Sequence, residues 1–306
     1  MPQPVAPHVF ALSGERMSYA RLERSGNGVA LMESRSTEIP PGTFQEGLLG
    51  GPCRDPRLLH EKLGELIEGL SATVREASLV LPDAWLRIVF TDGGDLPRTG
   101  TDRDEVLKWK LKRLVPYRVE ELRVRGSELT PYGATGSPRL MMAFALEGLL
   151  SQLEGVFEAE GIHLGQITNS ALAGLDALSG VADDGLKALT LVGHHDYTMV
   201  VARGGEPVLH RYKSLQGSDG ESELIRRDLR LTRTFLEQQL PDVPLAAVCL
   251  VAPREVEASW LAWLSEELEQ PARPVAREHL PPLAGAESRP LGELVPLLGA
   301  ALREVA

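Results

Sequence analysis

The chain has 306 residues, of which 43% are hydrophobic and 25% charged, and a formal net charge of −11. Its composition is that of a globular protein, and its length suits two lobes or two domains better than one. The acidic charge argues against a nucleic-acid partner, because phosphate binding needs clustered lysine and arginine. No stretch approaches the roughly 18 apolar residues of a membrane span and no signal peptide is visible, so we expect a cytoplasmic protein. Two cysteines, Cys53 and Cys249, are too few for a disulfide-built fold.

Strand-like segments come first along the chain. Strands are expected at 9–22 and 28–34, joined by a turn at 25–28, because the pair Asn27–Gly28 favours a type I′ hairpin. A helix is expected at 57–70, where leucines and one isoleucine follow the 3.6-residue period. Short strands follow at 77–81 and 85–91.

The next segments alternate between helix and strand. A helix begins near 101, with Thr101 or Asp102 as its N-cap, and ends near 114, before Pro116. Strands at 121–129 and 140–146 lead into a helix at 147–160, which Gly161 ends. A strand at 162–167 precedes a helix to 178 that Asn169 or Ser170 caps.

The second half opens on three strands, at 186–192, 197–203 and 207–213, followed by a long helix at 221–239. The apolar run at 244–251 is typical of a strand buried on both faces. Helices are expected at 255–268 and 290–305, the last kinked or restarted at Pro296. Each half opens on a β-meander and continues into βα units, which indicates a duplicated α/β fold.

Three short motifs, in the right order along the chain, resemble the type IV pilus assembly protein PilM family. The segment 77–84 resembles the family's strand end, with Pro82–Asp83 after the strand. The segment 105–117 resembles a helix that ends in a Pro-Tyr step, continued by Glu120–Glu121–Leu122. The segment 298–304 resembles the family's closing sequence.

The resemblance implies a two-lobed, actin-like ATPase fold, the duplicated ribonuclease H-like arrangement, with a small subdomain inserted in the first lobe. The family is related to FtsA and to the cytoplasmic part of GspL. By this resemblance the first lobe is 1–185, with the insertion at about 77–160. The second lobe is 186–306, and its last helix packs back towards the cleft between the lobes.

Actin-like ATPases hold magnesium and nucleotide between two facing hairpin loops, each with an aspartate at the end of its first strand. By resemblance, Ser13 and Gly14 belong to the first loop, and Gly193 and Thr198 to the second. Leucines, at 12 and 191, stand in the aspartate positions.

Two further departures concern the phosphate and adenine sides of this site. Glu15 stands where a hydroxyl group is expected, and Pro253–Arg254 stand where two glycines are usual. Losing the carboxylates removes the charge that magnesium needs. The loops are therefore interpreted as vestigial, with no catalytic residue, no metal and no cofactor expected; binding of ATP with magnesium is the alternative.

Histidines near the second loop offer another interpretation. His194, His195 and Asp196, with His210 on the next strand, could form a metal site. Adjacent histidines in a tight turn tend to point apart, and no third ligand has the usual spacing. A polar hairpin turn is the preferred interpretation.

A basic cluster surrounds the helix near 101–114. It is either a solvated helix face or a docking surface for an acidic partner or lipid headgroups. Trp109, on the same helix, is expected either in the core or lining a peptide groove. The cluster consists of Arg103, Lys108, Lys110, Lys112, Arg113 and Arg118.

The resemblance implies a cytoplasmic scaffold at the inner face of the inner membrane. Its partner would be the short cytoplasmic tail of PilN, held in a groove between the core of the first lobe and the insertion. Pilus motor components are further candidate partners, and the membrane is reached only through the partner. The candidate tail contacts are Lys108, Trp109, Lys112 and Tyr117.

Two alternatives stay open at this point. One is an ATPase or sugar-kinase-like phosphotransferase of the same fold, in which Asp196 or Glu15 replaces the missing carboxylates. The other is an actin-fold protein with a role unrelated to pili. The sequence has no Walker loop, no Gly-x-Ser-x-Gly and no His-Glu-x-x-His motif.

Overall fold

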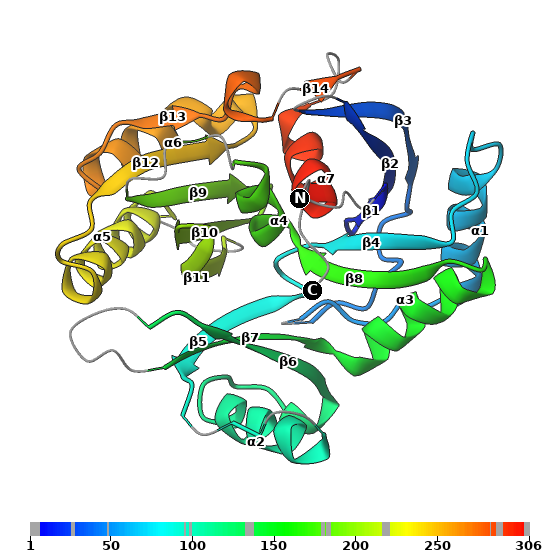
Figure 1. Ribbon diagram of the computed structural model, residues 1–306, viewed down its shortest axis with the longest axis horizontal. Coiled ribbons are helices and arrows are strands. Elements are labelled where there is room, and N and C mark those ends of the chain that lie inside the picture. Colours follow the sequence, from blue (N-terminus) through cyan, green and yellow to red (C-terminus); the bar gives the residue numbers. More distant parts are fainter. Residues whose placement is uncertain are drawn as a thin grey trace.

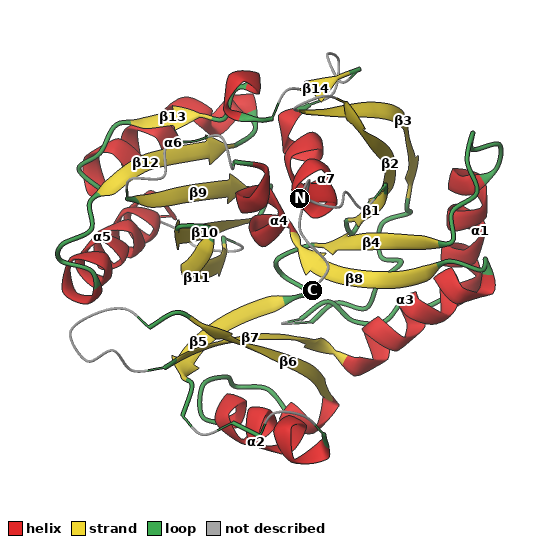
Figure 2. Ribbon diagram, viewed as in Figure 1, coloured by secondary structure: helices red, strands yellow, loops and turns green. Residues whose placement is uncertain are grey.

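The computed structural model describes residues 7–25, 28–47, 49–94, 96–97, 100–131, 138–178, 181, 185–215, 221–281, 283–285 and 290–302. These residues form a mixed α/β fold with a six-stranded, a five-stranded and a three-stranded sheet (Figures 1 and 2). None of the described helices is long and apolar enough to span a bilayer. Cys53 and Cys249 are both buried and unpaired.

The six-stranded sheet has the order β14-β3-β2-β1-β4-β8. The single strand expected at 9–22 is wrong: residues 13–15 turn the chain, so that two antiparallel strands form in its place. The expected turn residues Gly26 and Asn27 lie outside the described residues, and the strands on either side pair antiparallel. The strands are β1 (His8–Leu12), β2 (Arg16–Ser25), β3 (Gly28–Glu38), β4 (Glu76–Leu81), β8 (His163–Asn169) and β14 (Leu283–Ala284).

Helices cover both faces of this sheet (Figure 1). On one face lie α1 (Pro56–Ile67) and α3 (Glu147–Ala159), whose end is followed by Gly161 with a φ of 73°. On the other face lie α4 (Ser170–Ala177) and α7 (Leu291–Leu302), a single helix despite Pro296. The chain beyond Leu302, where the last helix was expected to continue, lies outside the described residues.

The three-stranded sheet has the order β5-β7-β6 and a buried cluster of its own, on which α2 (Thr101–Lys112) packs. The strands of this sheet are β5 (Arg87–Asp92), β6 (Leu122–Leu129) and β7 (Arg139–Leu146). The short helix η1 (Val119–Glu121) immediately precedes β6. This segment is shorter than the 77–160 expected for the insertion, because β4 pairs with β1 and β8 in the six-stranded sheet.

The N-cap expected for α2 is wrong. The capping residue is Gly100, at a φ of 92°, and no side chain caps the helix. Glycine reaches this conformation without the steric cost that a Cβ atom would add. Thr101 and Asp102 therefore lie inside the helix.

The five-stranded sheet has the order β11-β10-β9-β12-β13. Helices α5 (Glu221–Gln239) and α6 (Arg254–Glu267) pack with it around a second buried cluster, and α4 lies against β9 and β10. After η2 (Arg277–His279) the chain returns to the first sheet, where β14 pairs with β3 and α7 packs against β1 and β4. The strands are β9 (Leu186–Val192), β10 (Asp196–Arg203), β11 (Glu206–Ser214), β12 (Leu245–Val251) and β13 (Ala272–Pro274).

Candidate functional site

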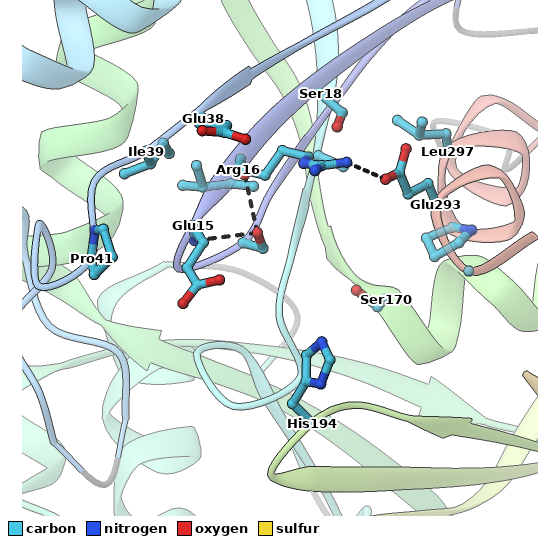
Figure 3. A pocket seen from close by; sticks show the side chains of 15 residues that line it. Glu15, Arg16, Ser18, Glu38, Ile39, Pro41, Ser170, His194, Glu293 and Leu297 are labelled. Carbon is cyan, nitrogen blue, oxygen red and sulfur yellow. Dashed lines mark hydrogen bonds and ion pairs between the residues drawn. The ribbon is translucent and has the colours of Figure 1, made fainter. Parts of the chain in front are cut away.

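A cavity of about 630 Å³ lies beside the turn between β1 and β2 (Figure 3). The hairpin and the end of β3 form one part of its wall, and α7 and the first residue of α4 form another. His194, from the turn after β9, faces the hairpin from across the cavity. This is where the two loops of an actin-like nucleotide site are expected to face each other.

Among the described residues, the wall of the cavity carries three carboxylates, of Glu15, Glu38 and Glu293, and a single guanidinium, of Arg16. Arg16 Nη1 donates to Glu293 Oε1 at 2.6 Å, which ties the hairpin to α7. The guanidinium is therefore already paired, and the remaining carboxylates repel a phosphate chain.

Hydrogen bonds of Ser13 close the turn between β1 and β2. The Ser13 amide donates to the Arg16 carbonyl at 2.8 Å, and the Ser13 hydroxyl donates to the same oxygen at 3.2 Å. The Glu15 amide donates to Ser13 Oγ at 3.4 Å. Ser13 lines the cavity, as expected for a loop residue, but its hydroxyl and amide are used inside the turn. Gly14 is not among the cavity-lining residues.

The second loop has a similar closure. The Gly193 amide donates to the Asp196 carbonyl at 2.9 Å, and a Cβ atom at Gly193 would lie 2.3 Å from Asp196 Oδ1. Thr198 is buried within β10. Neither Gly193 nor Thr198 lines the cavity, so of the four candidate nucleotide-loop residues the structure places only Ser13 there.

Of the two positions where an aspartate would hold magnesium, Leu12 is buried at the wall of the cavity and Leu191 is half-buried. Leu12 is 4% exposed and Leu191 packs against the same buried cluster. Within the described residues, no group of three or more histidine, cysteine, aspartate or glutamate side chains has the geometry to hold a metal ion. His210 instead joins a polar junction deeper in the molecule.

That junction links the end of β4, the start of α4 and β11. His210 Nε2 lies 3.3 Å from Asp83 Oδ1 and 3.1 Å from Asn169 Nδ2, and its side chain is 1% exposed. Asp83 Oδ1 also accepts from the Ala171 amide at 3.2 Å. In the sequence, Asp83 was noted only as part of the Pro82–Asp83 motif, and its contact with His210 was not predicted. Its position just after a buried strand is the feature that could have indicated a buried, structural carboxylate.

Asn169 also acts as the N-cap of α4, as expected. Its Oδ1 accepts from the Leu172 amide at 3.0 Å, while its Nδ2 donates to the Leu86 carbonyl at 3.0 Å. One side chain thus fixes the start of α4 and the link between β4 and β5.

Asp196, Tyr212 and Arg87 form a second polar cluster next to this junction. Burial raises the pKa of Asp196, and a hydrogen bond from Tyr212 and the charge of Arg87 oppose the rise. Burial, followed by the charge of Asp196, raises the pKa of Tyr212 to about 12. Asp196 is not among the residues that line the cavity, so it does not replace a magnesium-holding aspartate there.

The candidate tail contacts divide between two surfaces. Trp109 is 60% exposed on α2, with the Arg113 guanidinium 5.7 Å from its ring centroid, so it is not a core residue. Lys112 is also exposed, and its Nζ lies 3.9 Å from Glu120 Oε1. Lys108 lies close enough to Glu147 for its charge to lower the pKa of that carboxyl. Tyr117 packs on Phe144 and lines a hollow together with residues of β5 and β11.

Comparisons with solved structures identify the fold of the chain. No family model and no curated protein matches the chain. Among solved structures, it is similar to a chain of the PilM-PilN type IV pilus biogenesis complex, with 19% identity and a TM-score of 0.73 over 98% of this chain and 96% of that one. It is also similar to a Bacteroides thetaiotaomicron protein with an actin-like ATPase fold and unknown function, with 9% identity and a TM-score of 0.56 over 96% of both chains. The protein therefore has the two-lobed actin-like ATPase fold, in the form seen in the PilM-PilN complex.

Proposed function

We propose that this protein is a PilM-like cytoplasmic scaffold of a type IV pilus or a related secretion assembly. It binds the short cytoplasmic tail of a PilN-like inner-membrane protein and does not hydrolyse ATP. The observation that carries the proposal is the similarity in fold to the PilM-PilN complex over 98% of the chain. In this role the protein lies at the inner face of the inner membrane, and its partner supplies the membrane attachment.

The chemistry of the cavity supports a scaffold over an enzyme. Phosphoryl transfer depends on positioned cations around the phosphates. In the part of the chain that the structure describes, three carboxylates line this cavity, and its single guanidinium is bound to one of them. Leu12 and Leu191 offer no oxygen ligand where magnesium would be held.

The exposed side of α2 is the surface that we propose for the tail. A tryptophan that is 60% exposed, with lysine and arginine side chains beside it, is the kind of residue that anchors a partner. A flexible tail loses conformational entropy on binding, so we expect moderate affinity.

The proposal is tested by calorimetric titration with a synthetic peptide of the N-terminal tail of the PilN-like protein from the same genome. We expect saturable binding that Trp109→Ala weakens by about tenfold or more, as for an anchoring aromatic residue. Because Trp109 is largely exposed, this variant should unfold like the parent, within about 0.5 kcal/mol. Val256→Ala, at an exposed apolar residue of α6, is the matched control and should bind normally. Absence of tail binding would refute the proposal.

A nucleotide-binding protein of the same fold is the second candidate, since a cavity of about 630 Å³ lies where the nucleotide would bind. Titration with Mg-ATP separates the two candidates. We expect no heat of binding and no thermal shift. Saturable binding followed by release of phosphate would instead support the enzyme.

A further inference from the structure

Two carboxylates at the wall of the cavity of about 630 Å³ have no counter-ion within the described residues. Glu15 and Glu38 form no ion pair there, whereas Glu293 is bound to Arg16. Unpaired carboxylates attract a cation, and the net charge of −11 over the whole chain adds to this attraction at longer range. The charge that is unfavourable for a nucleotide is therefore favourable for a ligand of the opposite sign.

The Ser18 hydroxyl is a buried polar group at the wall of the same cavity. Ser18 is 6% exposed, and its hydroxyl has no hydrogen-bond partner within the described residues. Ser18 and Arg16 stand two residues apart on β2, so their side chains share one face of the strand. Figure 3 shows the Ser18 oxygen among the side chains that line the cavity. A buried hydroxyl without a partner costs free energy, which a ligand that donates a hydrogen bond would offset.

The carboxylates are spread around the cavity and do not converge on one point. Glu15 and Glu38 come from the hairpin turn and the end of β3, and Glu293 comes from α7 across the cavity (Figure 3). Within the described ranges, no three acidic, histidine or cysteine side chains lie close enough to share a metal ion. This spacing suits a ligand that carries its positive charges at separate points along a chain.

Between the carboxylates the wall is apolar. Aliphatic and proline side chains of the hairpin, the loop after β3 and α7 line it, and they can pack against methylene groups of a ligand. The volume lies within the range of small-molecule sites, about 300–1,000 Å³. The apolar residues are Leu12, Ile39, Pro41, Pro296 and Leu297.

We propose that this cavity binds a linear polyamine, an aliphatic chain with two or more ammonium groups. The ammonium groups pair with Glu15 and Glu38 and donate to the Ser18 hydroxyl, and the methylene groups pack on the apolar wall. The proposal depends on the charge and shape of the cavity, and not on binding of a tail at α2.

The probe is spermidine, and binding is measured by calorimetric titration at low ionic strength. Octanediol, an uncharged chain of nearly the same length, tests whether the ammonium groups are needed. We expect spermidine to bind saturably, with an affinity that falls as salt is added, and octanediol to bind at least about tenfold more weakly. Hydrogen exchange of the amides of residues 12–18 should slow when spermidine binds.

Variants locate the binding. Glu15 and Glu38 are exposed, so Glu15→Gln/Glu38→Gln should fold like the parent, and it should weaken spermidine binding by about tenfold or more. The matched control is Glu61→Gln/Glu158→Gln, which removes the same charge from exposed positions of α1 and α3, on the other face of the six-stranded sheet. It should bind like the parent.

The Ser18→Ala variant tests the buried hydroxyl, and we expect it to weaken spermidine binding by about fivefold. Three results would overturn the proposal: no saturable binding of spermidine, equal binding of octanediol, or equal weakening by the two double glutamine variants. The last result would mean that spermidine responds only to the overall acidity of the chain.

Discussion

Asn169 illustrates how a single side chain joins local and long-range structure. Its oxygen caps α4 and its nitrogen reaches the Leu86 carbonyl and His210, so the same residue orders a helix start and a junction between sheets. The cap was predictable from the sequence, because asparagine before a helix accepts an amide of the first turn. The junction was not, since His210 lies 41 residues further along the chain.

Replacing Asn169 should separate these two contributions. We expect Asn169→Ala to lower the free energy of unfolding by about 2–3 kcal/mol, the sum of a lost cap and of lost buried hydrogen bonds. Asn169→Asp keeps a capping oxygen but loses the donors and adds a carboxylate near Asp83. Urea denaturation should therefore rank the variants below the parent, and an Asp variant as stable as the parent would mean that the junction contributes nothing.

Two tyrosines with raised pKa values should make the stability of the protein depend on pH in the alkaline range. Burial raises the pKa of Tyr19 to about 12, from 10.0, and the same holds for Tyr212. A raised pKa means that the folded protein holds the neutral phenol, whereas the unfolded chain ionises at 10.0. The stability from these two groups is fully present below pH 10 and is lost as the pH rises towards about 12.

Tyrosinate absorbance measured against pH checks this prediction. We expect a late phase near pH 12 in the folded protein, reduced in Tyr19→Phe. A single midpoint at 10.0 for every tyrosine, in a sample that is still folded, would contradict it.

At the scale of elements, α2 shows why Trp109 is exposed. Leu107 and Leu111 are buried in the cluster of the three-stranded sheet and stand four residues apart, so they share one helix face. Trp109 stands two residues from each, about 200° around the helix, which turns it away from that face. The spacing of Leu107, Trp109 and Leu111 is visible in the sequence. The tertiary structure decides which of them face the sheet, because a three-stranded sheet offers a narrow surface.

The crossing of α4 and α7 depends on a small residue. A Cβ atom at Gly299 would lie 1.6 Å from the Ala173 carbonyl oxygen. Gly299→Ala should therefore push the helices apart and lower the free energy of unfolding by about 3 kcal/mol.

Gly155→Ala is the matched control for this substitution. Gly155 lies in α3 and is exposed, and a Cβ atom there meets nothing within 4 Å. This change should raise the free energy of unfolding by about 0.5–1 kcal/mol, because alanine loses less backbone entropy in a helix. Thermal and urea unfolding of both variants measure the difference, and equal effects would show that α4 and α7 do not pack closely.

At the scale of the whole molecule, the cavity is assembled from distant parts of the chain. Arg16 and Glu293, which form its ion pair, are 277 residues apart. Glu15 comes from the turn before β2, and Glu38 is the last residue of β3. The acidic character of the cavity is therefore a property of the tertiary structure, although Glu15 alone was noted in the sequence as unfavourable for phosphate.

Reversing this charge tests whether it excludes nucleotide. Glu15 and Glu38 are exposed, so the double variant Glu15→Lys/Glu38→Lys should remain folded. We expect it to bind ATP weakly where the parent does not, with an affinity that falls as salt is added. Calorimetry at two ionic strengths measures both effects. If the double variant still fails to bind ATP, the closed turns and the packed leucines exclude the nucleotide, and the charge is secondary.

The sequence by itself determined most helices and strands, because apolar periodicity and turn residues act over a few neighbouring positions. It also placed the Asn169 cap and the leucines at 12 and 191, and its short motifs indicated the actin-like fold. Where the insertion begins depends on the tertiary structure, because β4 pairs with β1 and β8 and so belongs to the six-stranded sheet. The tertiary structure also decided the Asp83–His210 junction and the acidic cavity, because each brings together residues whose proximity depends on packing between distant elements and not on their order in the chain.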